Sequence, residues 1–259
     1  GGGMRTVILQ TDIVWGDAEA NRRNLTELVG SYEGVDLFVL PEMFATGFGF
    51  PPQQVAEPEV GGPTLEWMRR MAQEGNCAVA GSVAVRTASD TFRNRFYFVF
   101  PDGNVEYYDK RHLFAFGGEH LEYTPGDRRV IVTYKGFRIL LQVCYDLRFP
   151  VWMRNRNDYD MMLFVANWPV GRRAVWDVLL QARAIENQCY VLGVNRVGTD
   201  PVATYNGGSI ILNAYGKTVA VCEEGAVCGA EAVLELEPLL NFRRRFPVLE
   251  DRDGFEIKV

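Results

Sequence analysis

The sequence predicts an α/β protein built as a four-layer αββα sandwich with an internal pseudo-twofold duplication. Short apolar runs typical of buried strands alternate with amphipathic stretches typical of helices. The order of these segments in the first half of the chain is repeated in the second half. Each half would form a sheet with helices on one face only, so the two halves can cover each other's open face.

The length suits one large α/β domain or two small ones, and we expect a single domain over residues 4–259. The chain has 259 residues, of which 47% are hydrophobic, and we attribute Gly1–Gly3 before Met4 to the expression vector. A net charge of −6 argues against nucleic acid as a partner. No apolar stretch is long enough to cross a membrane, and five cysteines without a Cys-x-x-Cys pair suit a reducing cytoplasm.

In the first half, apolar runs and turn signals define five strands and two helices. Asp17 is the expected N-cap of the first helix, and Gly62-Pro63 opens the second. A strand ends directly before Pro41-Glu42, and Asp102-Gly103 forms a turn. The predicted strands cover residues 6–11, 35–40, 77–85, 96–100 and 105–108.

The second half repeats this order. Residues 139–146 resemble 7–12, residues 159–167 resemble 35–42, and residues 189–197 resemble 77–85. A helix over 174–188 is expected to bury an apolar stripe formed by Val175, Val178, Leu179, Ala182 and Ile185. Residues 242–251, which include the run Arg243–Arg245, lack any period and are predicted to pack as an extended tail.

Cys144 stands where a predicted buried strand ends. The apolar residues 139–143 lead directly into it, and the following Phe149-Pro150 changes the direction of the chain. Strand ends are where loops meet and ligands bind in α/β folds, so the thiol is a candidate nucleophile. The alternative is a buried structural cysteine, since a free cysteine packs like a small hydrophobic side chain.

Spacing disfavours several other cysteine chemistries. A Cys-x5-Arg phosphatase loop is excluded because only three residues separate Cys144 from Arg148. A Cys–His pair has only His112 and His120 to draw on. A zinc site is disfavoured because neither Cys222 nor Cys228 has a second ligand at zinc-finger spacing.

Two further charged residues follow predicted strands. Glu42 lies in Leu-Pro-Glu-Met-Phe and Lys110 lies in Tyr-Asp-Lys-Arg-His-Leu-Phe, and each alone is typical of a surface charge. Together with Cys144 in Cys-Tyr-Asp-Leu-Arg-Phe-Pro, they resemble in order and spacing the three signature segments of the nitrilase superfamily of carbon–nitrogen hydrolases. The resemblance covers essentially all of residues 4–256 and implies that family's αββα sandwich and Glu-Lys-Cys triad.

A fourth segment extends the resemblance. Residues 118–126 are similar to the family segment in which a second glutamate precedes Pro-Gly, which assigns Glu119 to that position; the alternative is an exposed loop acid. The segments around Cys144, Lys110 and Asn167-Trp168-Pro169 resemble most closely the bacterial omega-amidases, which hydrolyse the amide of 2-oxoglutaramate and related acids.

The resemblance implies a mechanism without metal or organic cofactor. Glu42 would deprotonate Cys144, which attacks an amide carbonyl and forms a thioester. Lys110 and the backbone N–H of Tyr145 would hold the developing oxyanion, and Glu119 would position groups around Lys110.

A substrate carboxylate needs a cation in a pocket that already holds two glutamates. Arg148 is the first candidate because a guanidinium binds a carboxylate bidentately, and Arg172 and Arg173 are the alternatives. Trp168 is a further substrate-binding candidate, although a structural role is favoured for its segment. An ion pair of Arg148 with Asp146 is an equally supported interpretation.

Three questions stay open at this point. The same triad would serve a nitrilase, a carbamoylase or an aliphatic amidase, and a binding protein that has lost turnover would keep the fold. The resemblance implies a homodimer through the segments after Cys144 and the C-terminal tail. Trp152, Phe242 and Phe246 would suit such an interface, but internal packing would explain them equally well.

Overall fold

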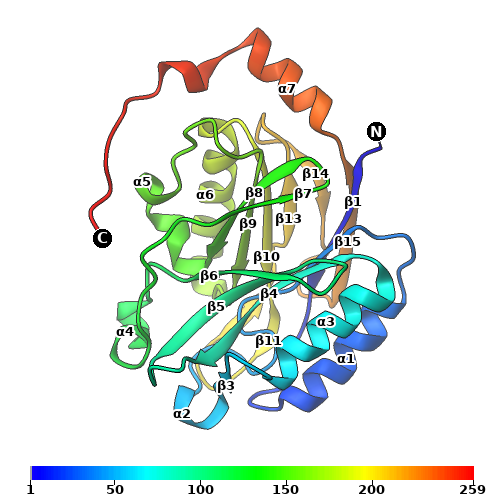
Figure 1. The fold of residues 1–259 in the computed structure, drawn as a ribbon, viewed down its shortest axis with the longest axis vertical. Helices are drawn as coiled ribbons and strands as arrows, with labels where there is room; N and C mark the ends of the chain where they lie inside the picture. Colours follow the sequence, from blue (N-terminus) through cyan, green and yellow to red (C-terminus); the bar gives the residue numbers. More distant parts are fainter. Residues whose placement is uncertain (1) are drawn as a thin grey trace.

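The computed structural model describes residues 2–259, in which strands and helices alternate through both halves of the chain (Figure 1). The elements of the first half are β1 (Met4–Gln10), α1 (Ala18–Gly30), β2 (Leu37–Val39), α2 (Pro52–Val55), β3 (Glu57–Pro58), α3 (Pro63–Gly75), β4 (Ala78–Arg86), β5 (Phe92–Val99) and β6 (Val105–Asp109). The remaining helices are α4 (Glu119–Glu122), α5 (Pro150–Met153), α6 (Arg173–Glu186) and α7 (Leu236–Arg245). The remaining strands are β7 (Ile131–Tyr134), β8 (Phe137–Val143), β9 (Met161–Ala166), β10 (Tyr190–Asn195), β11 (Val197–Thr199), β12 (Thr204–Asn206), β13 (Ile210–Leu212), β14 (Thr218–Val221) and β15 (Cys228–Leu234).

The two main sheets have the same topology, which confirms the predicted duplication. The first has the order β15-β1-β2-β4-β5-β6, with β3 paired to β4, and the second has the order β7-β8-β9-β10-β13-β14. In both strand orders, the second strand pairs in parallel with the third and the third with the fourth, and the remaining neighbours are antiparallel. The short strand β3 also pairs in parallel with β4. The similar segments noted in the sequence form β1 and β8, β2 and β9, and β4 and β10.

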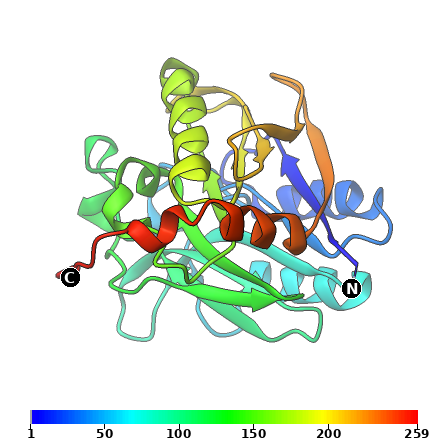
Figure 2. The same ribbon diagram turned by 90° about the horizontal axis from the view of Figure 1, so that it is seen from above.

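Three apolar layers separate the four structural layers. One layer lies between the sheets and contains side chains such as Ile8, Phe98, Leu141 and Leu163. A second lies between the first sheet and helices α1 and α3, and a third lies between the second sheet and α6. Figure 2 shows α6 and the α1–α3 pair on opposite sides of the molecule. The predicted αββα sandwich is therefore confirmed.

Local sequence signals place the helix ends. Asp17 accepts a hydrogen bond from the backbone N–H of Ala20 at 3.0 Å, and Pro63 occupies the first turn of α3 after the N-cap Gly62. Asn76 ends α3 in the left-handed conformation, with φ of 47°. Among residues 2–259, no helix combines the length and apolar character needed to span a membrane.

The buried face of helix α6 overlaps only in part with the predicted one. Its buried side chains are Trp176, Leu180, Arg183 and Ala184. Val178 and Ile185 of the predicted core stripe are 63% and 51% exposed. Val175 and Leu179 of the same stripe are partly buried against the core, so the prediction was wrong only for part of the stripe. Arg183 made the centre of the buried face look polar in the sequence. Arg183 is accommodated there because its guanidinium donates to the carbonyl of Leu147 at 2.8 Å and pairs with Glu186 at 3.0 Å.

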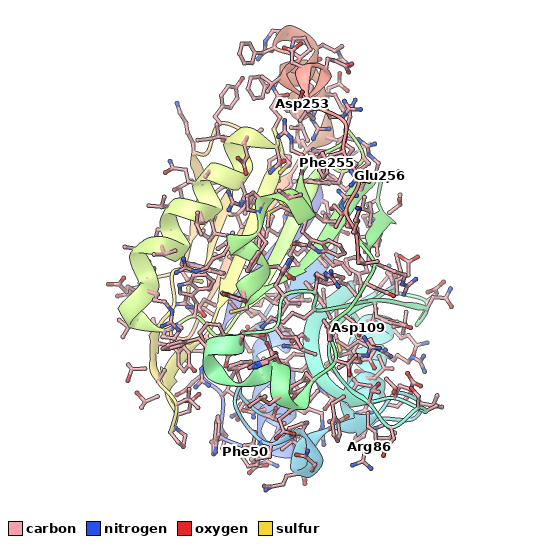
Figure 3. All side chains as sticks on the ribbon, turned by 90° about the vertical axis from the view of Figure 1, so that its left-hand side faces the viewer. Phe50, Arg86, Asp109, Asp253, Phe255 and Glu256 are labelled. Carbon is pink, nitrogen blue, oxygen red and sulfur yellow. The ribbon has the colours of Figure 1, made fainter. Side chains whose placement is uncertain are left out.

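The C-terminal stretch is not the predicted extended tail over 242–251. Residues up to Arg245 belong to α7, and Val248–Asp251 form a 3₁₀ helix. Arg243 fastens α7 to the second sheet, since its guanidinium donates to the Asp160 carboxylate at 2.8 Å and to two backbone carbonyls beside it. The chain then runs past Asp253, Phe255 and Glu256 (Figure 3), and Ile257 reaches a cavity bordered by α5.

Candidate active site

The thiol of Cys144 is held at the end of β8 by a strained backbone. Cys144 has a φ of 44° and Met43, which follows Glu42, has a φ of 49°. Both values lie in the left-handed region that side chains other than glycine rarely adopt, and such strain is concentrated at functional sites. Cys144 opens a 3₁₀ helix (Cys144–Arg148), so the N–H of Tyr145 lies in a first turn, where N–H groups have no partner within the helix.

Three buried charges converge beside this thiol. Lys110, which follows β6, places its Nζ 3.0 Å from Oε2 of Glu42 and 2.9 Å from Oε1 of Glu119. Glu42 follows β2, and its other oxygen accepts from the backbone N–H of Asn167 at 3.0 Å. The Sγ of Cys144 lies 3.9 Å from the backbone carbonyl of the same Asn167. The structure thus brings together all four charged or nucleophilic residues that the sequence singled out.

Burial and mutual contact set the ionisation of this cluster. Burial raises the pKa of Glu42, and the charge of Glu119 raises it further against the opposing effect of Lys110. Burial alone would lower the pKa of Lys110, but the two carboxylates hold it well above its ordinary value. Burial and the charge of Glu42 raise the pKa of the Cys144 thiol. The raised pKa of the thiol favours its protonated form, and the raised pKa of Glu42 makes its carboxylate a stronger base.

Asp146 fastens the loop that carries Cys144 to the loop that carries Lys110. One carboxylate oxygen accepts from the backbone N–H of Val143 at 2.9 Å and from the hydroxyl of Tyr108 at 2.7 Å. The other lies 2.8 Å from Nδ1 of His112 and accepts the backbone N–H of that residue. His112 thus contacts Asp146 and not the thiol, which removes the Cys–His pair considered from the sequence. Asp146 is also not paired with Arg148.

A cavity of about 270 Å³ opens onto the thiol. Its lining includes Cys144, Lys110 and Tyr145, together with Arg148, Arg172 and Trp168. The guanidinium of Arg148 lies 5.9 Å from the ring centroid of Trp168, and that of Arg172 lies 5.3 Å from the ring centroid of Phe114. Within residues 2–259, neither guanidinium forms an ion pair or donates a hydrogen bond.

Arg173 does not share this position. Its guanidinium contacts Asp177, Asn206 and Glu224, and the residue is absent from the cavity lining. The suggestion that Arg173 binds a substrate carboxylate is therefore corrected: it joins α6 to the loop after β14. No group of three or more His, Cys, Asp or Glu residues within 2–259 is arranged to hold a metal ion.

Comparison with known proteins decides the family. The model of the carbon–nitrogen hydrolase family matches residues 5–236. The chain belongs to the carbon–nitrogen hydrolase family. It is thus an enzyme that cleaves carbon–nitrogen bonds by hydrolysis.

Individual relatives of this carbon–nitrogen hydrolase match over nearly their whole length. The omega-amidase YafV of Yersinia enterocolitica is 47% identical over 97% of this chain and 98% of its own. The 2-oxoglutaramate amidase of Bacillus subtilis is 33% identical over 94% and 95%. The crystal structure of XC1258 from Xanthomonas campestris, a CN-hydrolase superfamily protein, superposes with a TM-score of 0.96 at 39% identity and covers both chains fully.

Sequence reasoning missed two amides of the site in this hydrolase. Asn94 donates to both glutamates, and the side chain of Asn167 donates to the backbone carbonyl of Glu42. The sequence did contain a signal for Asn94. It lies two and four positions before Phe96 and Phe98 in the same strand, so it lies on the same face of the sheet as these two residues, which face the inter-sheet core. The predicted strand began at residue 96 and so excluded it, whereas β5 begins at Phe92.

Proposed function

We propose that this enzyme hydrolyses the terminal amide of small omega-amides of dicarboxylic acids, such as 2-oxoglutaramate or 2-oxosuccinamate, and releases ammonia. One observation carries the proposal. A small cavity presents a thiol and an ammonium together with two guanidiniums that lack an acidic partner within residues 2–259. A short molecule with an amide at one end and a carboxylate at the other complements this cavity. The amide would lie at the thiol and the ammonium, and the carboxylate would lie at the guanidiniums. The names of the Yersinia and Bacillus relatives support the same class.

In the acylation step, Glu42 accepts the proton of Cys144 as the sulfur attacks the amide carbonyl. The carbonyl oxygen becomes an oxyanion, which the ammonium of Lys110 and the N–H of Tyr145 stabilise. Collapse of this intermediate breaks the carbon–nitrogen bond, and the proton held by Glu42 passes to the leaving nitrogen. Ammonia leaves and the acyl group stays on Cys144 as a thioester.

In the deacylation step, Glu42 accepts a proton from water, whose oxygen attacks the thioester carbonyl. The oxyanion again contacts Lys110 and the N–H of Tyr145. The carbon–sulfur bond then breaks, the acid leaves, and the proton returns to the thiolate. Glu119 holds the ammonium of Lys110 in place throughout, since it contacts Nζ at 2.9 Å and is itself fixed by the N–H of Phe114 at 2.7 Å. The arsenic adduct in the active site of the Xanthomonas structure suits a nucleophilic thiol, because arsenic binds sulfur.

A substrate panel tests the assignment. We expect the highest kcat/KM for anionic omega-amides, lower values for neutral short amides, and little turnover of N-carbamoyl acids or nitriles. A preference for carbamoyl compounds or nitriles, measured as ammonia release, would identify another member of the family with the same triad.

We expect Arg148→Met to lower kcat/KM for an anionic omega-amide by roughly 10- to 100-fold, because a charge-assisted pair with the substrate carboxylate is lost. Turnover of a neutral short amide should change by less than about threefold, because that substrate has no carboxylate to bind. Arg173→Met is the matched control and should leave the ratio of the two activities unchanged. Equal losses on both substrates in Arg148→Met would assign Arg148 to structure, with Arg172 next to be tested.

We also propose a homodimer that uses the exposed face of α6 and the C-terminal segment. Val178 and Ile185 on α6 are joined by Tyr215 and Phe246, which are 50% and 60% exposed. Such large exposed apolar side chains favour burial against a second copy. We therefore expect light scattering to give twice the chain mass of 29.2 kDa, and Val178→Asp/Ile185→Asp to give a monomer. Val60→Asp, at a site 85% exposed elsewhere, should remain dimeric. A monomeric wild type would contradict the proposal.

We place the enzyme in a reducing compartment such as the cytoplasm. All five cysteines are free thiols, and the proposed nucleophile is one of them.

A further inference from the structure

Asn94 contacts Glu42, Glu119 and Lys110 from one position on β5. Its side-chain Nδ2 donates to Oε2 of Glu42 at 2.8 Å and to Oε2 of Glu119 at 3.0 Å. Its backbone carbonyl accepts the backbone N–H of Lys110 at 3.0 Å. Glu42, Lys110, Glu119 and Asn94 therefore form a closed ring, in which each carboxylate accepts from both the ammonium and the amide.

The surroundings of Asn94 indicate that it serves the charged ring and not the stability of the fold. The residue is 1% exposed and lies in phase with Phe96 and Phe98, where an apolar side chain would complete the inter-sheet core. Its Oδ1 is buried and has no hydrogen-bond partner among residues 2–259, which is a cost to stability. Rotating the amide would direct that oxygen toward two carboxylates. The donors of Asn94 are thus used only on the glutamates.

A neutral donor has a specific advantage between these two acids. The cluster holds two carboxylates and one ammonium, so one negative charge is not compensated within it. A second cation would compensate that charge but would also make Glu42 a weaker base. An amide supplies two N–H groups in a fixed plane, which set the spacing of the two Oε2 atoms without adding a charge or a titrating proton.

We propose that Asn94 is a positioning residue that keeps Glu42 aimed at the thiol while it takes and returns a proton, and keeps Glu119 on Lys110. The inference rests on the proposed function, since it presumes that Glu42 acts as the general base. Asn94 acts through the two glutamates, because it does not line the substrate cavity. Next to the backbone hydrogen bond between Asn94 and Lys110, an ion pair also joins this part of the chain. Arg95 on β5 lies 2.8 Å from Asp109 on β6, and Asp109 is labelled in Figure 3.

The test compares Asn94→Ala and Asn94→Asp with the wild type and with Gln188→Ala. Gln188 is a matched control because it is also a buried amide whose oxygen has no hydrogen-bond partner within residues 2–259. Its side chain donates to the backbone carbonyl of Phe246 and not to a residue of the ring. We expect Asn94→Ala to lower kcat by roughly 10- to 100-fold with KM within about twofold, because the base is misplaced while the substrate cavity is intact.

The pH profile separates positioning from folding. Loss of a donor to Glu42 makes its carboxylate easier to protonate, so the acid limb of kcat/KM should move to higher pH by about 0.5–1 unit. Asn94→Asp keeps the shape and replaces both donors with carboxylate oxygens, so it should lose at least as much activity as Asn94→Ala. Near wild-type turnover in Asn94→Asp, or an unmoved acid limb in Asn94→Ala, would overturn the proposal.

Alkylation of Cys144 by iodoacetamide distinguishes this failure from failure of the proposed function. The rate depends on transfer of the thiol proton to unprotonated Glu42, so its pH midpoint follows the pKa of Glu42, and it does not depend on which amide is the substrate. Its pH midpoint should rise in both Asn94 variants and stay at the wild-type value in Gln188→Ala. If the midpoint is unchanged in the Asn94 variants, the proposed role of Asn94 is wrong. If the midpoints shift as expected but the wild type does not hydrolyse omega-amides, only the substrate assignment is wrong.

Discussion

Cys144→Ala is expected to release ammonia from an omega-amide at least about 10⁴-fold more slowly than the wild type, because removal of a covalent nucleophile leaves only binding and electrostatic stabilisation. The variant should stay folded, because the sulfur does not stabilise the strained backbone of residue 144, whose φ is 44°, and alanine fits the same space. Ammonia release at saturating substrate measures the loss, and thermal unfolding checks the fold.

Cys77→Ala is the matched control for this variant. Cys77 is also buried, and burial raises the pKa of its thiol to about 11, but it lies between α3 and β4, away from the catalytic cluster. Its replacement should leave turnover within about twofold of the wild type. Ammonia release by Cys144→Ala within tenfold of the wild type would contradict the thioester mechanism. Alkylation of Cys144 no faster than Cys77 would favour a binding protein without turnover.

The fold was predictable because strand periodicity and internal similarity are local properties of the sequence. Residues 139–146 and 7–12 resemble each other because β8 and β1 occupy equivalent places in two sheets of the same topology. The face of α6 was not predictable in the same way. Val178 and Ile185 have helical spacing, and only the tertiary contact of Arg183 with Leu147 shows that the face with Arg183 is the buried one.

The same distinction separates the predicted from the missed residues of the site. Glu42, Lys110 and Cys144 each follow a strand, where a charged or reactive side chain is conspicuous in the sequence. Asn94 and Asn167 have common, neutral side chains. Their importance arises from hydrogen bonds to residues 52 and 125 positions away in the chain, which no local pattern encodes. The choice between Arg172 and Arg173 also needed the structure, because neighbours in sequence at the start of a helix point in different directions.

Lys110→Met is expected to remove activity nearly as completely as Cys144→Ala and, unlike it, to destabilise the fold. The ammonium is buried between two carboxylates, and removing one partner of a buried ionic group typically costs about 3–5 kcal/mol. Two effects then act on catalysis. The oxyanion loses a donor, which typically costs about 3–4 kcal/mol of barrier, and Glu42 tends to hold a proton because Glu119 is no longer compensated.

The pH dependence of stability follows from the same charges. Without Lys110, the pKa of a glutamate in the folded cluster lies above its value in the unfolded chain, so the folded state binds more protons. The free energy of unfolding of Lys110→Met should therefore fall relative to the wild type as the pH rises from about 5 to about 8. Urea unfolding at several pH values measures this difference.

Adding Glu119→Gln separates charge compensation from contact with the oxyanion. Lys110→Met/Glu119→Gln removes one carboxylate along with the ammonium, so a large part of the lost stability at neutral pH should return. Activity should not return, because the oxyanion still lacks the Nζ donor. If the double variant regained activity in proportion to its stability, Lys110 would serve only to neutralise the two glutamates. The developing charge would then be stabilised without it, by backbone groups such as the N–H of Tyr145.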